Sequence, residues 1–226
     1  MSHHWGAALI GHKQALVGLA IFAVVAAGAG IATQHRLQGA DHIDPPTRTD
    51  PAVDPIPDEA ADLADVYAFF DTTHVVLAVT FGGPAATHKP AFYDRDVLYN
   101  LHVSNDGDPA QSEIPIKIRF GFDGPRAGVQ ITGLPNGIII AGPVESNLEV
   151  SGITARAGLF DDPFFFDAQG LRESRTMGTL RFNNQRSFFA NANITAVVIK
   201  IPRSMVQNGN RLVHVWSDTA RLGGQL

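Results

Sequence analysis

The chain has 226 residues, a formal net charge of −5 and no cysteine. The acidic balance argues against a nucleic-acid partner. The lack of cysteine excludes disulfides, thiolate metal sites and a cysteine nucleophile, so the fold must depend on an ordinary apolar core.

The first predicted element is a membrane-spanning helix. Residues 15–32 are 18 consecutive apolar or glycine residues, which as a helix span about 27 Å, close to the bilayer core. Signal-peptide apolar regions are shorter, about 7–15 residues, although the small residues 27–29 leave a cleaved signal peptide as the alternative. We expect residues 1–37 to be an uncleaved anchor that keeps Met1 or Ser2.

The flanks of this helix predict its orientation. The N-terminal flank carries Lys13 and no acid, whereas Arg36 on the other side is soon followed by acids. Because positive charge favours the cytoplasmic side, we expect the N-terminus in the cytoplasm and the rest of the chain outside it. Small residues allow another helix to approach closely. The predicted helix interface consists of Gly18, Ala23, Ala27 and Gly30.

Residues 38–60 are predicted to be an extended tether. Positions 38–59 contain five prolines and six acids. Proline fixes φ and disfavours both helix and strand. This segment is therefore expected to run as a spacer or to lie along a surface, including the surface of a partner.

Residues 61–226 are predicted to form an exported, mainly β domain. Short runs rich in Val, Ile, Phe and Tyr alternate with turn sequences such as SNDGDP and LPNG. The predicted strands are 65–70, 75–81, 97–104, 115–122, 129–132, 137–141, 179–182, 195–201 and 211–218. This many short strands indicate an antiparallel β-sandwich or a partly closed barrel.

Several short motifs follow one another between residues 41 and 222. They are DHIDPP, DEAADLADVYAFF, VLYNLHVSNDGDP, GIIIAGP, GLFDDPFFFD and ITAVVIKIP followed by VHVWSDTAR. In these motifs the chain resembles a single copy of the bacterial domain-of-unknown-function family 4331, with a retained membrane helix as the unusual feature. The resemblance implies an exported, mostly β domain without an established activity, and with the predicted anchor it implies a bacterial inner membrane with a cytoplasmic N-terminus and a periplasmic domain.

A divalent-cation site, for example for calcium, is the main ligand hypothesis. DHIDPP supplies Asp41, His42 and Asp44, and FDDPFFFD supplies Asp161 and Asp162. If the tether folds back on the domain, these side chains would offer carboxylate oxygens and one imidazole to the ion. Aspartate before proline also starts turns, which leaves purely structural turns as the alternative.

The sequence SNDGDP also resembles part of a calcium loop. Asp106 and Asp108 flank Gly107, but the twelfth position counted from Ser104 is Pro115, where the calcium loop needs glutamate. We therefore expect a hairpin turn with left-handed backbone within residues 105–107.

Catalytic templates are absent from the sequence. It contains no Gly-x-Ser-x-Gly elbow, His-Glu-x-x-His pair or phosphate loop. His214 and Ser217 are close in the chain, but positions i and i+3 of a strand face opposite sides. The phenylalanines 164–166 are interpreted as core or interface anchors. We expect a protein that is not an enzyme and has no resident cofactor.

These observations favour an accessory, structural subunit of a larger membrane complex, for example a photosynthetic or respiratory one. Its helix, tether and β domain would contact other subunits and the lipid bilayer. The alternative is a free, membrane-tethered module that binds a cation or a small ligand, and a third possibility is a hydrolase of unknown type. Co-migration with a large complex after detergent extraction would separate the first two.

Overall fold

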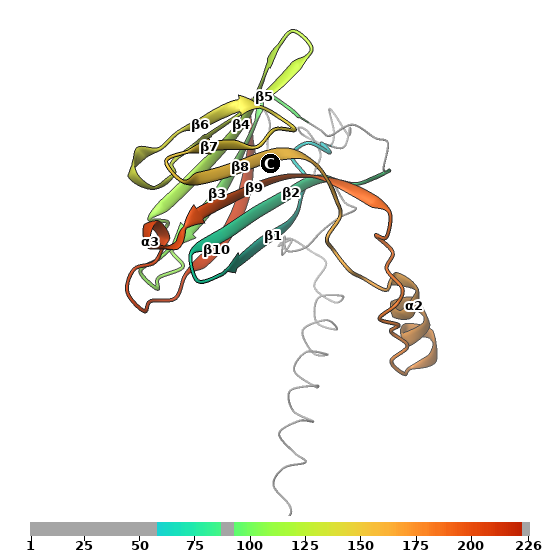
Figure 1. The fold of residues 1–226 in the computed structure, drawn as a ribbon. Coiled ribbons are helices and arrows are strands. Elements are labelled where there is room, and N and C mark those ends of the chain that lie inside the picture. The colour runs from blue at the N-terminus through green and yellow to red at the C-terminus, as the bar shows by residue number, and fades with distance from the viewer. Residues whose placement is uncertain (1–57, 87–92, 223–226) are drawn as a thin grey trace, which may run out of the picture. The chain divides into compact units, whose positions relative to one another are not determined.

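The computed structural model describes residues 58–86 and 93–222, which build two antiparallel sheets that face each other (Figure 1). The predicted anchor, its helix interface and the tether up to residue 57 lie outside the described residues. Within the described part of the chain, no helix is long and apolar enough to cross a membrane.

The first sheet has the strand order β1-β2-β9-β8-β7. Its strands are β1 (Leu63–Phe70), β2 (His74–Ala86), β9 (Ala192–Pro202), β8 (Ile153–Asp161) and β7 (Leu148–Val150). The long strands β2 and β9 lie at its centre and pair over most of their length. Both are rich in β-branched residues, which suit the pleated, half-buried surface of a sheet.

The second sheet has the strand order β10-β3-β4-β5-β6. Its strands are β10 (His214–Arg221), β3 (Val97–Ser104), β4 (Ile114–Asp123), β5 (Arg126–Thr132) and β6 (Ile140–Pro143). In β4, buried and exposed residues alternate strictly through the sequence IPIKIRF. Such alternation places one face of the strand on the core and the other in solvent.

The core lies between the inner faces of the two sheets. Leu77 and Ile199 from the first sheet and Ile116 from the second are fully buried and belong to one apolar cluster. Phe81 packs against Tyr99 of the other sheet in a tilted arrangement, with ring centroids 4.1 Å apart. Each such side chain contributes about 1.5–3 kcal/mol when it leaves water. The structure is therefore a β-sandwich, the first of the two predicted architectures.

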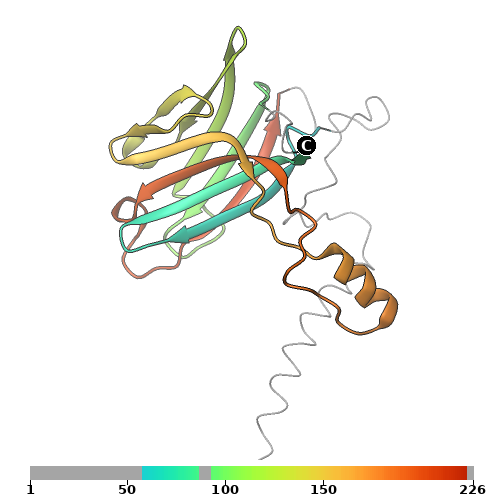
Figure 2. The ribbon, with the colours of Figure 1, turned by 45° about the vertical axis from the view of Figure 1, so that its right-hand side comes forward.

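A segment between β8 and β9, residues 162–191, leaves the sheets and carries the main helix, α2 (Ala168–Met177). We call it the excursion. Figures 1 and 2 show α2 beyond the ends of the strands from two directions. Short helical turns also occur at η1 (Pro135–Gly137) and α3 (Arg203–Val206).

All but one of the nine predicted strands overlap an observed strand. The exception is 179–182, which the structure shows as an irregular loop after α2. Its backbone is held by a side chain instead of a neighbouring strand, because Ser174 Oγ accepts a hydrogen bond from the Arg181 amide. Strands β7 and β8 and helix α2 were not predicted, since charged and small residues interrupt their apolar patterns.

The SNDGDP sequence forms the start of a connection longer than the predicted hairpin turn. It joins β3 to β4 over residues 105–113, and Gly107 has a φ of 90°. The Asp106 carboxylate accepts from the Asp108 amide (2.8 Å) and from the Ser104 hydroxyl (3.2 Å). The Asp108 amide is also the main cause that lowers the pKa of Asp106. These contacts agree with a turn in which the carboxylate of Asp106 binds the backbone and side chain of neighbouring residues.

Candidate functional site

Two of the five predicted metal ligands, Asp161 and Asp162, are described by the structure; Asp41, His42 and Asp44 lie outside the described residues. Both carboxylates border an open pocket of about 540 Å³ where β8 passes into the excursion. Within the described ranges, no group of three or more His, Cys, Asp or Glu side chains is placed to hold a metal ion. The predicted cation site thus stays a prediction.

The surroundings of Asp162 combine a turn with a cluster of charge. Its Oδ1 accepts a hydrogen bond from the Phe164 amide (2.9 Å), the turn-starting role that was the structural alternative. Nearby, the Tyr67 hydroxyl donates to Asp65 Oδ2 (2.9 Å). Burial raises the pKa of Tyr67, and the Asp65 hydrogen bond and the charges of Asp65 and Asp162 raise it further. This end of the first sheet is therefore electronegative.

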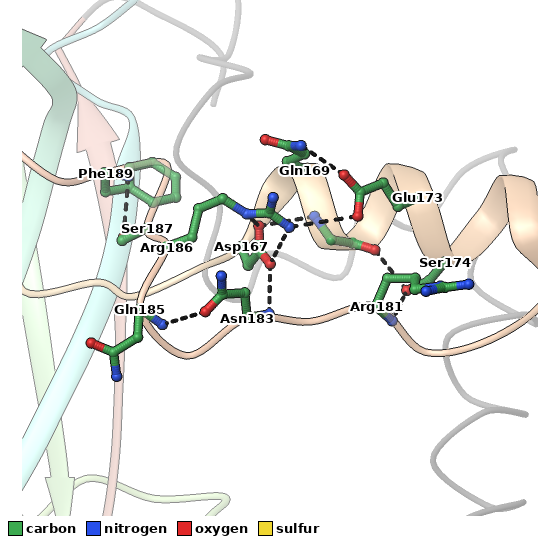
Figure 3. Close-up of polar contacts among 11 residues, drawn as sticks. Asp167, Gln169, Glu173, Ser174, Arg181, Asn183, Gln185, Arg186, Ser187 and Phe189 are labelled. Carbon is green, nitrogen blue, oxygen red and sulfur yellow. Dashed lines mark hydrogen bonds and ion pairs between the residues drawn. The ribbon is translucent and has the colours of Figure 1, made fainter.

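The excursion is organised around one buried carboxylate, Asp167, which is only 4% exposed (Figure 3). Its Oδ1 accepts from the Gly170 amide (2.9 Å) and so caps α2, and its Oδ2 accepts from the Asn183 amide (2.8 Å). The Arg186 guanidinium donates to both oxygens, at 2.6 and 2.9 Å. Such a bidentate pair fixes position as well as charge.

These contacts keep Asp167 ionised. The hydrogen bonds from Arg186 are the largest influence that holds the pKa of Asp167 well below its usual range, followed by the Gly170 and Asn183 amides. Gly170 itself is required there, because an added Cβ would overlap the Asp167 carboxylate and lie 2.9 Å from the Arg181 carbonyl oxygen. One carboxylate therefore joins the start of the helix to the loop that returns beside it.

A second contact joins the helix to the returning loop near its far end. Ser174 Oγ donates to the Gly170 carbonyl (2.6 Å) and accepts from the Arg181 amide (2.8 Å). Glu173 lies 3.8 Å from Arg186 and accepts from the Gln169 side chain at 2.6 Å. Figure 3 shows Asp167 and Ser174 directed toward the returning loop, with Gln169 and Glu173 on the other side of the helix. The excursion is thus held by hydrogen bonds on its inner side.

Phenylalanines pack where the excursion joins the sheet. Phe164 meets Phe189 edge-on with ring centroids 5.2 Å apart, and it stacks on Phe166 at 6.2 Å. Phe189 is buried, whereas Phe165 and Phe188 are exposed. The interpretation of the phenylalanines 164–166 as anchors therefore fits Phe164 and Phe166, and Phe165 faces solvent.

Sequence reasoning missed a polar cluster on the second sheet. His102 Nε2 lies 2.7 Å from Asp218 Oδ2, and Asn100 Nδ2 donates to Asp218 Oδ1 at 2.6 Å. The His102 ring stacks on Trp216 with centroids 5.1 Å apart. Ser217 pairs with the fully buried Leu101 and so lies on the opposite face of β10. The cluster depends on the register between β3 and β10, which no motif in the sequence reveals.

A buried ionic network ties the start of the described chain to its last strand. The Arg221 guanidinium forms a bidentate pair with Asp58 and lies 2.8 Å from Asp94 Oδ2. The Asp58 hydrogen bond is the largest influence that raises the pKa of Arg221. The neighbouring Tyr99 hydroxyl donates to the Ala60 carbonyl oxygen. This network joins residue 58 to β10 through side chains that are mostly buried.

The chain crosses from the second sheet to the first at Glu145. This residue has a φ of 59°, a left-handed conformation that costs a non-glycine residue strain. Its carboxylate accepts from the Leu159 amide (2.7 Å), the Arg156 guanidinium (3.0 Å) and the Tyr93 hydroxyl (3.1 Å). Burial, followed by the Glu145 charge, raises the pKa of Tyr93. These contacts hold the crossing in place.

The outer faces of the two sheets differ in polarity. Strand pairing aligns side chains of β1, β2 and β9 on the outer face of the first sheet. This apolar outer face consists of Tyr67, Phe69, Val76, Ala78 and Val198. On the neighbouring strands β8 and β9, the basic residues Arg156 and Lys200 lie on the same outer face. The outer face of the second sheet is polar and carries Asn100, His102, Lys117, Arg119, Gln130, Thr132 and Asp218.

The comparisons with known proteins leave the chain without a relative to report. No family model matches it, and neither a curated protein nor a solved structure matches it. The resemblance to family 4331 thus stays a prediction that depends on the motifs between residues 41 and 222.

Proposed function

We propose that the protein is a non-catalytic accessory subunit of a larger membrane complex, such as a respiratory or photosynthetic one. In this proposal residues 1–37 anchor it in a bacterial inner membrane, and the β-sandwich lies on the periplasmic side. The single observation that supports the proposal is the apolar outer face of the first sheet.

This face has the properties of a protein contact surface. Phe69 is 56% exposed, the side chains of Tyr67, Val76 and Val198 in the same rows are half-buried, and Ala78 between them is buried. One face of an antiparallel sandwich sheet normally faces water and is polar, as in the second sheet. A contiguous apolar patch is typical of a protein–protein interface.

The expected occupant is another subunit and not the chain's own tether. Residues 38–59 carry six acids and five prolines, with Ile43, Val53 and Ile56 as their main large apolar residues. Such a segment has little apolar surface to bury, whereas interface cores are depleted in charged residues. A partner with an apolar helix or sheet face matches this surface better.

Co-migration of the full chain tests the proposal. After mild detergent extraction, the wild-type protein should run on a native gel with a large complex whose other subunits mass spectrometry identifies. Phe69→Lys should reduce the co-migrating fraction, because it replaces the most exposed apolar side chain of the proposed contact with a charge. Gln130→Lys, an exposed change on the polar outer face, is the matched control and should leave the fraction unchanged. A wild-type protein that always runs alone would overturn the proposal.

The predicted anchor offers a second test of the same assembly. Ala23→Leu combined with Ala27→Leu should weaken co-purification while the β-sandwich keeps its melting temperature, because close helix packing in lipid depends on small residues. Full assembly of this double variant would assign the contact to the exported domain alone.

A cation- or small-ligand-binding module is the second candidate function. It is supported by the pocket of about 540 Å³ beside Asp161 and Asp162, whose other wall carries Asn184, Gln185 and Asn191. These groups supply the oxygen ligands that calcium prefers. Calcium should raise the melting temperature of the full chain, and Asp161→Asn with Asp162→Asn should abolish the rise. Asp123→Asn, at an exposed acid elsewhere, is the control. If calcium raised the melting temperature of both variants equally, the site would be excluded.

A further inference from the structure

The outer surface of the excursion is basic in an otherwise acidic chain. Asp162 and Asp167 lie at the start of the excursion, and the rest of it, residues 168–191, contains four arginines and one acid, Glu173, whereas the whole chain has a net charge of −5. Arg186 is bound to Asp167, and Glu173 is turned toward Gln169 and Arg186. The remaining arginines, 172, 175 and 181, are exposed. The tip of the excursion therefore presents positive charge to solvent.

The same tip presents large apolar side chains. Met177 is 63% exposed at the end of α2, and Leu180 and Phe182 in the following loop are 66% and 53% exposed. Between them Gly178, with a φ of 69°, ends the helix and turns the chain. Since hydrogen bonds to Ser174 and Asp167 hold the helix and loop together, these side chains are presented by an ordered backbone.

We propose that the tip of the excursion, residues 172–182, docks on the surface of a bilayer that contains anionic lipids. Met177, Leu180 and Phe182 enter the boundary between headgroups and acyl chains, and the three exposed arginines contact lipid phosphates. Apolar side chains next to arginines are the combination that binds such an interface. The excess of arginines at the tip favours a bilayer with anionic headgroups as the binding partner, because the charges are complementary.

The ordered backbone strengthens the proposal. A docking loop that is already folded loses less conformational freedom when it binds. The inference is independent of the subunit function proposed above, since it requires a bilayer but no partner protein. The two proposals can therefore fail separately.

Fluorescence of the full chain in nanodiscs provides the test. The chain has no cysteine, so Leu180→Cys accepts one environment-sensitive label at the tip. Phe122→Cys is the matched control, because Phe122 is also an exposed apolar residue, in the hairpin between β4 and β5. In discs of phosphatidylcholine with phosphatidylglycerol, the label at position 180 should shift to the blue and be quenched by nitroxide lipids. The label at position 122 should do neither.

Charge removal and salt then examine the role of the arginines. Arg172→Gln, Arg175→Gln and Arg181→Gln should each lower the ratio of docked to undocked label by about fivefold. Added salt should lower the same ratio in the labelled Leu180→Cys chain that keeps all its arginines, because salt screens exposed charges. The salt series needs no arginine substitution, so it tests the role of charge even if an arginine variant fails to fold.

Three results would overturn the proposal. The label at position 180 could stay in an aqueous environment in anionic discs, or it could dock equally well in pure phosphatidylcholine and at high salt. It could also become protected in a native complex and remain solvent-exposed in the lipid discs. The last result would assign the tip to a protein partner.

Discussion

The sandwich and the excursion are built with opposite polarity. In the sandwich, apolar side chains such as Leu77 and Ile199 fill the interior. In the excursion, the inner side holds Asp167, Arg186 and Ser174, whereas Leu180 faces solvent. The sandwich obtains its stability from hydrophobic burial, which is non-directional. The excursion obtains its shape from directional hydrogen bonds, and the apolar side chains of Met177, Leu180 and Phe182 at its tip are exposed.

The largest expected effect lies in the buried ionic network of the sandwich. Arg221→Met should lower the free energy of unfolding by about 3–5 kcal/mol, because it leaves buried Asp58 without its guanidinium. Urea denaturation measures this change. Arg211→Met, at an exposed position, is the control. An equal and small effect of both changes would mean that the network does not stabilise the sandwich.

Matched leucine truncations compare the two regions directly. Leu77→Ala in the core should cost about 2–5 kcal/mol of unfolding free energy, because it opens a cavity among fully buried side chains. Leu180→Ala in the excursion should change the same quantity by no more than about 0.5 kcal/mol. The comparison of the regions would be wrong if Leu180→Ala proved as costly as Leu77→Ala in urea denaturation.

Removal of the central carboxylate of the excursion should have a local effect. In Asp167→Asn, the cap of α2 and the bidentate pair with Arg186 are weakened together. Amide hydrogen exchange should therefore speed up at Gly170 and Asn183, and core amides of the sandwich should keep their protection. Glu173→Gln, which alters a longer contact to Arg186, should change exchange much less. Uniform loss of protection would show that excursion and sandwich unfold as one unit.

The smallest expected effect is a loosening of the turn between β1 and β2 in acid. Hydrogen bonds from the Thr73 and His74 amides lower the pKa of Asp71 from 3.8 to about 2. A carboxylate with a lowered pKa stabilises the fold above pH 3.8 and loses this contribution as the pH falls through about 2. NMR titration should locate this step, and Asp71→Asn should remove it. A carboxylate that titrates near 3.8 would contradict the contacts at this turn.

Most of the strands could be predicted from local pattern. The alternation in β4 and the apolar runs of β2 and β9 depend on residues that are neighbours in the chain, so they are visible in the sequence. The excursion was harder, because the residues 179–182 have the composition of a strand but no strand partner. Its helix α2 is mostly polar, which hides it from a search for apolar periodicity.

By itself, the sequence determined that the fold is mainly β and that His214 and Ser217 lie on opposite faces of their strand. Both features depend on the alternation of side chains within a strand. Tertiary structure alone brought His102 to Asp218, 116 positions apart, and Arg221 to Asp58, 163 positions apart. The candidate site divides in the same way. Aspartates 161 and 162 were visible as a motif, but the pocket beside them depends on residues 184–192 returning to meet them. Contacts between residues so far apart in the chain follow from the order and register of the strands, and no local sequence pattern reveals these.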